Sequence, residues 1–368
     1  MTKNILGYLS NYNMPLIGEN HRYNEIDGLV FAIFSSAPIG PDIRRLRGTF
    51  STPIIPIGKT MGELSELLID IDNSELLSSR FGFSPSGDYG RHLLFFNHIT
   101  ANNRYKDIKI IGFTYNNDGF CQFSAFTFEI SPGEYVIAYR GTDNSLEGWY
   151  ESAKLFHENV PSRHLALEYL KSEISKYKGI FRLVGHSKGG HLALCAAVMS
   201  DIKHKINIRS IINYDGPGFS SEFISKYHKD ILLLQHKVYR FSPADALVSS
   251  ILFGQNIMYY EKNMRYIKPY GSKIPPNQHN YFNWTISSGN FELVPRSNLS
   301  ILFQNASAKL YHLYSLEELE RTFDQLYEQA LDTYKDDDNI LNQFDMFTFF
   351  LGAAIKLLSV SKRQSHLS

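Results

Sequence analysis

The chain has 368 residues, of which 37 are basic and 37 are acidic, so its formal net charge is zero. This length accommodates one large α/β domain with additions. The balanced charge offers no electrostatic footprint for nucleic acid, and we expect no polynucleotide partner. The only two cysteines, Cys121 and Cys195, fall in a predicted strand and a predicted helix, which indicates small buried side chains rather than a disulfide framework.

The sequence contains no segment typical of export or membrane insertion. Near the start, Asn11, Asn13 and Glu19 interrupt any apolar run of secretory length. The longest uncharged apolar run, 346–355, is too short to span a bilayer. We therefore expect a cytoplasmic protein without a transmembrane segment. Peripheral contact with a membrane through the last predicted helix stays open, and the sequence does not indicate an oligomeric state.

Residues 1–107 are predicted to form a helical N-terminal region packed on the main domain. Apolar residues recur at three- and four-residue spacings over 25–34, 61–77 and 89–100, and prolines predict loops between these helices. The glycine-, proline- and serine-rich segment 84–90 favours a turn over a flap above a site. Nothing in this region carries obvious chemistry.

Residues 108–300 are predicted to form the main domain. Its first three strands are separated by turn signals and form an antiparallel ribbon, after which strands and helices alternate. This alternation predicts a mostly parallel sheet with helices on both faces, and functional side chains at the carboxyl ends of the strands. The expected strands are 108–115, 120–130, 135–139, 180–184, 208–214 and 237–241, and the expected helices are 164–178 and 188–200.

Residues 301–368 are predicted to form a C-terminal helical extension. The sequence from Ser315 to Glu318 is typical of a capping box that opens a helix ending near Tyr334. A polar break at 335–339 separates it from a last helix over 341–360, whose phenylalanines and leucines recur at helical spacing. We expect this helix to pack on the main domain rather than to act as a lid.

The sequence Gly-His-Ser-Lys-Gly-Gly at 185–190 lies between a predicted strand and a small-residue helix. Strand, glycine-rich turn around a serine, and helix is the context of a nucleophile elbow, which exposes the serine above a sheet. The amino terminus of the following helix would point its dipole at the same place. We therefore predict that Ser187 is a catalytic nucleophile.

A serine nucleophile needs a histidine base and an acid that orients it, in the chain order Ser, Asp, His for this architecture. Asp245 follows the predicted strand 237–241, and His279 lies in a later loop, so we predict the triad Ser187, Asp245 and His279. Asp215 also ends a strand and is the serious rival for the acid. Four other histidines precede the serine or adjoin it and are expected to be structural: His157, His164, His186 and His191.

The oxyanion of such a reaction needs two donors. The backbone amide of Lys188, the residue after the nucleophile, is expected to be one. The loop at Arg140-Gly141-Thr142 ends a strand, and the amide of Thr142, with its hydroxyl as a further candidate, is expected to be the other. The histidine and cysteine spacings show no zinc pattern, so we expect no metal and no cofactor.

These motifs together resemble the class 3 (fungal-type) lipases, and more closely a bacterial branch with a Gly-His-Ser-Lys-Gly-Gly elbow. The resemblance covers about residues 20–295. It implies an α/β-hydrolase fold, serine ester hydrolysis and the triad Ser187, Asp245 and His279. The matching segments are Ala138 to Asp143, Gly148-Trp149, Gly185 to Gly190, Tyr239 to Val248 and His279, together with Gln122 to Ala125 and Asp215 to Phe219.

This chain departs from the pattern of these relatives at two positions. It has His191 where they have asparagine, and Ser152 where they have an acid soon after the Gly-Trp pair. The second departure predicts a weakly braced Thr142 loop, for which Asp143 and Glu151 are alternative braces. We expect a lipase or esterase acting on a small-molecule or lipid ester. The alternatives are a thioesterase or amidase with the same triad, and a catalytically silent interaction protein.

Overall fold

The computed structural model describes residues 2–16, 23–37, 39, 55–70, 88–117, 121–142, 146–155, 157, 160–251 and 263–333. Its centre is a seven-stranded sheet in the order β1-β2-β3-β4-β5-β6-β7. β1 to β3 are antiparallel, and β3 to β7 are parallel. The strands are β1 (Lys109–Asn117), β2 (Gln122–Ser131), β3 (Glu134–Tyr139), β4 (Ile180–His186), β5 (Ile208–Tyr214), β6 (Val238–Pro243) and β7 (Met264–Ile267).

Alternate residues of each central strand face opposite cores, as a buried sheet requires. In β3, Val136 and Ala138 belong to the core on one face, and Ile137 and Tyr139 belong to the core on the other. The strands therefore bury both faces, and their apolar runs predicted this arrangement. The mostly parallel sheet with helices on both faces is the α/β arrangement expected from the sequence.

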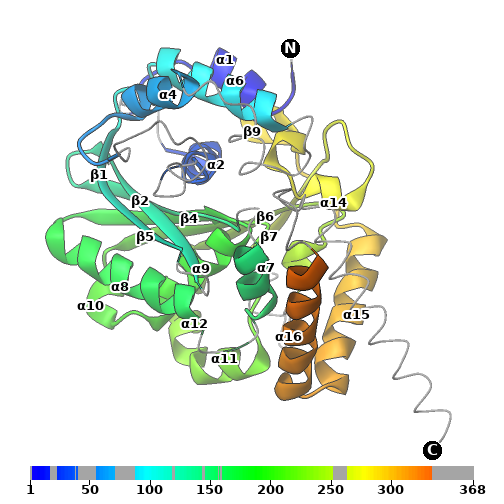
Figure 1. Cartoon of the computed structure of the whole chain (residues 1–368). Helices are drawn as coiled ribbons and strands as arrows, with labels where there is room; N and C mark the ends of the chain where they lie inside the picture. The colour runs from blue at the N-terminus through cyan, green and yellow to red at the C-terminus, as the bar shows by residue number, and fades with distance from the viewer. Residues whose placement is uncertain are drawn as a thin grey trace, which may run out of the picture.

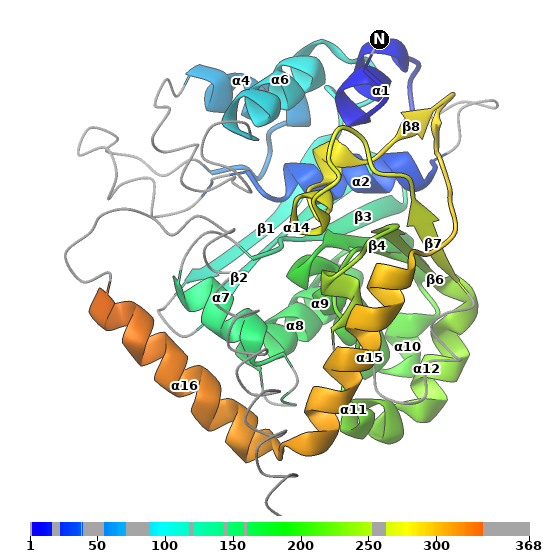
Figure 2. The same ribbon diagram turned by 90° about the vertical axis from the view of Figure 1, so that its right-hand side faces the viewer.

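One face of the sheet is covered by the N-terminal helices. α2 (Glu25–Phe34) lies directly on the sheet, and α1 (Ile5–Asn11), α4 (Met61–Asp70) and α6 (Asp88–Ala101) form a layer above it (Figures 1 and 2). α2 is buried on all sides because its sequence is apolar all round. Its polar residue Asp27 is fully buried and accepts hydrogen bonds from Arg104 and Tyr105.

The other face is covered by helices of the main domain. α8 (Pro161–Lys176) and α9 (Lys188–Met199) pack against each other and on the sheet, and α10 (Ile202–Lys205), α11 (Ser221–Lys226) and α12 (His228–Leu234) complete this layer (Figure 1). α9 is the most buried of these helices, because alanines and glycines line it and let it approach the strands closely. α7 (Leu146–Ala153) lies beside the end of β2.

Two C-terminal helices leave the main domain as a hairpin. α15 (Asn298–Leu313) and α16 (Leu316–Thr333) meet at one end and diverge from it (Figure 2). The predicted capping box is confirmed, since Glu318 N donates to Ser315 Oγ at 3.2 Å and Ser315 N donates to Glu318 Oε2 at 2.8 Å. No helix of the described residues is long and apolar enough to cross a membrane.

The remaining short elements lie between α12 and the hairpin. They are η1 (Gln235–Lys237), η2 (Val248–Ser250), α14 (Pro275–Gln278), η3 (Tyr281–Asn283), β8 (Ile286–Ser287) and β9 (Asn290–Phe291). The predicted segment 84–90 lies mostly, and the predicted helix 341–360 wholly, outside the described residues, as do residues 71–77 of the second predicted helix. The predicted domain boundaries at 107 and 300 stay predictions.

Candidate active site

Ser187 lies on a sharp turn between β4 and α9, as predicted for a nucleophile elbow. Its backbone has φ 58° and ψ −129°, a conformation that side-chain-bearing residues rarely adopt. Its amide donates to Tyr214 O of the neighbouring strand at 2.9 Å. The serine is therefore held in a strained conformation by the sheet itself, at the carboxyl end of a central strand.

The glycines of the elbow allow close packing rather than unusual backbone angles. A Cβ on Gly185 would collide with the backbone of Gly189, and one on Gly189 would collide with Tyr139 O of β3. Neither glycine has a positive φ. The motif thus brings the start of α9 against two strands, which fixes the first-turn amides of α9 next to Ser187.

His279 is oriented by Asp215. His279 Nδ1 lies 2.6 Å from Asp215 Oδ2, and both side chains are buried, at 7% and 0% exposure. Asp215 follows β5, the strand beside β4, and its own backbone has a positive φ of 50°. Such a conformation is tolerated by aspartate better than by most residues. The imidazole N–H therefore donates to the carboxylate, and the tautomer leaves Nε2 as the basic nitrogen.

The acid predicted at Asp245 does not have this role in the structure. Asp245 follows β6, which is separated from the strand of Ser187 by β5. Its Oδ2 accepts a hydrogen bond of 2.8 Å from Gln278 Nε2, the residue before His279. The carboxylate that contacts His279 belongs instead to the nearer strand, and the rival acid Asp215 replaces Asp245 in the site.

His186 fixes the backbone of the His279 loop. Its Nε2 donates to His279 O at 2.9 Å, and the two rings lie 4.5 Å apart. Burial, together with the nearby charge of His279, holds the pKa of His186 well below its usual value, so its ring is neutral. Trp284 Nε1 also donates to Gln278 O at 2.7 Å. The loop that carries His279 is thus tied to the elbow on one side and to a buried tryptophan on the other.

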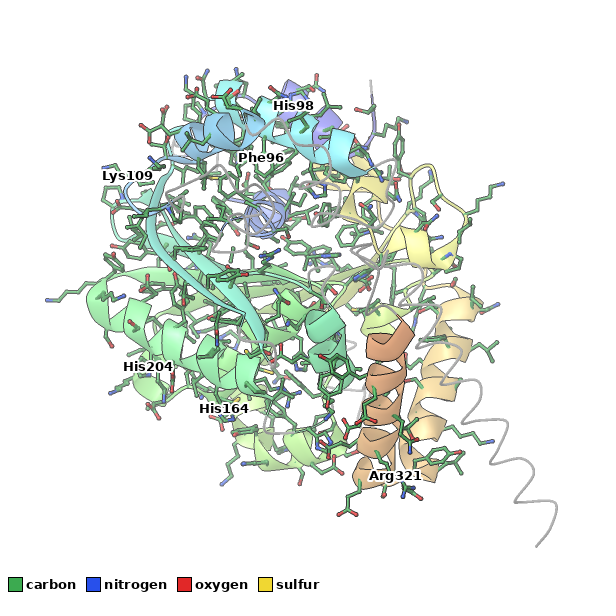
Figure 3. The ribbon with its side chains drawn as sticks, in the orientation of Figure 1. Phe96, His98, Lys109, His164, His204 and Arg321 are labelled. Atoms are coloured by element: carbon green, nitrogen blue, oxygen red, sulfur yellow. The ribbon has the colours of Figure 1, made fainter. Side chains whose placement is uncertain are left out.

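The other histidines considered from the sequence lie away from Asp215. His164 is exposed on the outer side of α8 (Figure 3), and His157 Nε2 lies 3.3 Å from Glu320 Oε2 of α16. His191 is fully buried, and its Nε2 accepts from Arg163 Nε and Nη2 at 3.1 and 2.8 Å. Burial and the charge of Arg163 hold the pKa of His191 well below its usual value.

Thr142 lies at the end of β3, next to the elbow. A Cβ on the preceding Gly141 would lie 3.5 Å from Ser187 Cβ, so the loop runs directly beside the serine. Thr142 Oγ1 lies 2.6 Å from Ser152 Oγ, and Ser152 Oγ donates to Gly148 O at 2.7 Å. Because the single proton of Ser152 is used, Thr142 donates to Ser152. Ser152 is therefore a brace, and the expectation of a weakly braced loop is corrected; Asp143 lies outside the described residues.

The side chain of Lys188 is buried beneath the two expected oxyanion donors. Its Nζ donates to Gln122 O, Gln122 Oε1 and Glu151 Oε2 at 2.6, 2.8 and 2.8 Å. Lys188 and Glu151 are 1% and 2% exposed. Burial raises the pKa of Glu151, but the charge and hydrogen bonds of Lys188 outweigh it and hold the pKa below its ordinary value. Sequence reasoning assigned only the backbone of Lys188; nothing local in the sequence indicated the contacts of its side chain.

The chain is similar, at low sequence identity, to solved structures of lipases. Lip2 lipase from Yarrowia lipolytica is 13% identical, with a TM-score of 0.39 over 79% of this chain and 93% of that one. M37 lipase is 16% identical, with a TM-score of 0.34 over 82% and 95%. Lipase II from Rhizopus niveus is 14% identical, with a TM-score of 0.31 over 58% and 78%. No protein of curated function matches the sequence. The model of the Mbeg1-like family matches residues 99–328, and the chain therefore belongs to this family.

Proposed function

We propose that this protein is a serine hydrolase that cleaves carboxylic esters through an acyl-enzyme, with Ser187, His279 and Asp215 as its triad. The observation that carries the proposal is the 2.6 Å contact between buried His279 and Asp215, on the strand adjacent to the strained Ser187. A buried carboxylate that orients an imidazole is part of the arrangement that activates a serine hydroxyl as a nucleophile.

In the proposed first half-reaction, His279 Nε2 accepts the proton of Ser187 as Oγ attacks the ester carbonyl. The C–O bond to the alcohol then breaks, and the imidazolium returns the proton to the departing alkoxide. In the second half-reaction, water gives its proton to His279 and attacks the acyl-enzyme, which releases the acid and restores Ser187. Asp215 stabilises the imidazolium in both steps and stays ionised throughout.

The proposed oxyanion donors are the backbone amides of Lys188 and Thr142. Lys188 opens α9, so its amide has no acceptor within the helix and lies at the positive end of the helix dipole. The Thr142 hydroxyl donates to Ser152, which leaves the amide of this residue as the donor we assign. Two amides held on rigid elements supply charge stabilisation without reorganisation during the reaction.

The test combines active-site labelling with turnover. A fluorophosphonate should label the wild-type protein, and a panel of p-nitrophenyl esters of increasing chain length should show which acyl group is preferred. Ser187→Ala should abolish labelling and lower kcat/KM by ~10⁴-fold or more, with circular dichroism unchanged. A wild-type protein that neither labels nor hydrolyses any ester contradicts the proposal and favours a silent interaction protein. Faster turnover of thioesters or amides than of esters would instead identify the protein as a thioesterase or an amidase with the same triad.

A further inference from the structure

We infer that the side chains of Lys188, Glu151 and Gln122 are positioning residues that set the spacing of the two oxyanion-hole amides. The inference rests on the proposed function and concerns groups that do not touch the substrate. It assigns a role to a buried ion pair that the triad does not use. We refer to these three side chains as the sub-elbow network.

The sub-elbow network joins five separate segments of the chain. Lys188 opens α9, Gln122 opens β2 and Glu151 lies on α7. Glu151 Oε2 also accepts from Gln122 N at 3.1 Å, and Glu151 Oε1 accepts from Ser162 N at the start of α8 at 3.0 Å. Gln122 Nε2 reaches Gly141 O at 3.4 Å. The elbow and the Thr142 loop are therefore connected through one carboxamide and one carboxylate.

Gln122 contacts both sides of the proposed oxyanion hole. Its Oε1 accepts from Lys188, whose backbone amide is one proposed donor, and its Nε2 points to the carbonyl of Gly141, which precedes the other. The peptide plane between Gly141 and Thr142 includes both that carbonyl and the Thr142 amide. A fixed Gly141 carbonyl therefore fixes the direction of the Thr142 N–H.

The charges of the network also argue for a positioning role. All three protons of the Lys188 ammonium have acceptors, and both oxygens of Glu151 accept hydrogen bonds. A buried ion pair seldom stabilises a fold more than apolar residues of similar size. Because every hydrogen-bonding atom of both charged groups has a partner, the network holds one defined geometry. This matters for catalysis, since moving a catalytic group by about 1 Å costs ~10²-fold in rate.

Glu151 of the ion pair lies on one side of α7, and a neighbouring side of this helix contacts α16. Tyr150 stacks on Tyr327 with ring centres 4.2 Å apart, and Lys154 pairs with Asp324 at 2.7 Å. Glu151 and Ser152 therefore extend from a helix that is also held by its contacts with α16. A rigid support is what a positioning group requires.

The first test is Gln122→Met, which keeps the size of the side chain and removes both links. We expect kcat to fall ~10- to 100-fold with KM within about twofold, the signature of an interaction realised in the transition state. The matched control is Thr127→Val on the same strand, since Thr127 is fully buried and its hydroxyl bonds Tyr169 at 2.7 Å away from the elbow. The control should lose stability without losing kcat.

The second test is the pair Lys188→Met with Glu151→Gln, which removes both charges together. A single change would leave an uncompensated buried charge and could unfold the protein, whereas the double change removes both charges and keeps the volume of the side chains, with the loss of the three hydrogen bonds that Lys188 donates. We expect the same fall in kcat and a Tm close to that of the wild type.

The outcomes separate this inference from the proposed function. If the wild-type protein does not react with a fluorophosphonate, both fail. If it reacts, and if Gln122→Met and the double variant hydrolyse p-nitrophenyl ester as fast as Thr127→Val does, only the positioning role is overturned. A rise in KM at constant kcat in either variant overturns it as well, because it would indicate substrate contact.

Discussion

The two sides of the candidate active site are built differently. On the acid side, Asp215 and Ser187 end neighbouring parallel strands, and sheet hydrogen bonds place them with positive φ angles. On the oxyanion side, Thr142 lies in the loop after β3, and this loop is held by side chains from α7, β2 and α9. Register determines the first arrangement, and a hydrogen-bond network determines the second. On the acid side, a single substitution should therefore have a large effect on kcat. On the oxyanion side, the effects of substitutions should be smaller and should not add.

The largest effect is expected from the acid. Asp215→Asn keeps the shape of the side chain, but its amide nitrogen donates a hydrogen bond to His279 Nδ1 instead of accepting one. The imidazole proton then lies on Nε2, so the ring presents the wrong tautomer to Ser187. We expect kcat to fall ~10⁴-fold at neutral pH, with folding retained. Steady-state kinetics on a p-nitrophenyl ester measures this change.

Asp245→Asn is the matched control for the acid. Its carboxylate accepts only a neutral carboxamide hydrogen bond from Gln278 in the described contacts, so we expect a loss of tenfold or less. If Asp245→Asn lowers kcat more than Asp215→Asn does, Asp245 is the acid of the triad, as the sequence predicted.

A smaller effect is expected at the brace of the oxyanion loop. Thr142→Val removes the hydroxyl that donates to Ser152 but leaves the backbone amide in place. We expect kcat to fall about tenfold or less, against the 10² to 10³ typical of a lost oxyanion donor. Ser152→Ala also removes the hydrogen bond to Gly148 O and should cost at least as much, and the double variant should cost no more than Ser152→Ala, because both changes remove the same hydrogen bond between Thr142 and Ser152. A loss of several hundredfold for Thr142→Val alone would make the hydroxyl itself a donor.

The smallest effect concerns stability and pH. His186 and His191 are buried with pKa values held below the ordinary 6.5, so the unfolded chain binds protons that the native protein does not. Stability is therefore complete above pH 6.5 and falls as the pH drops below it, by about 1.4 kcal/mol per pH unit for each histidine. Urea denaturation between pH 7 and 5 measures the slope.

A histidine substitution sharpens this measurement. His191→Asn should reduce the slope by about 1.4 kcal/mol per pH unit, since it removes one buried imidazole whose pKa lies well below its ordinary value. His164→Asn, an exposed change on α8, is the control and should leave the slope as it is. Equal slopes in all three proteins would mean that His191 does not contribute to acid sensitivity.

Local patterns in the sequence predicted the helices and strands around the elbow correctly, but they did not predict which side chains from distant segments meet. The elbow at Ser187, the strands around it and the capping box at Ser315 follow from short-range spacing, and all are found. The acid was misassigned because both Asp215 and Asp245 end strands in the required chain order. The choice depends on which strand lies beside β4, a tertiary fact. The role of Ser152 was likewise hidden, because a hydroxyl that donates onward can replace a carboxylate only in one particular geometry.

The strained backbone of Ser187 has a consequence for engineering this protein. A non-glycine residue at a positive φ costs about 1–3 kcal/mol, a sizeable part of the 5–15 kcal/mol that separates a folded domain from its unfolded chain. Ser187→Gly should relax the turn and raise the melting temperature while removing the nucleophile. A selection for heat resistance alone would therefore drift toward an inert scaffold, and a thermostable variant has to be chosen by its reaction with a phosphonate as well as by its Tm.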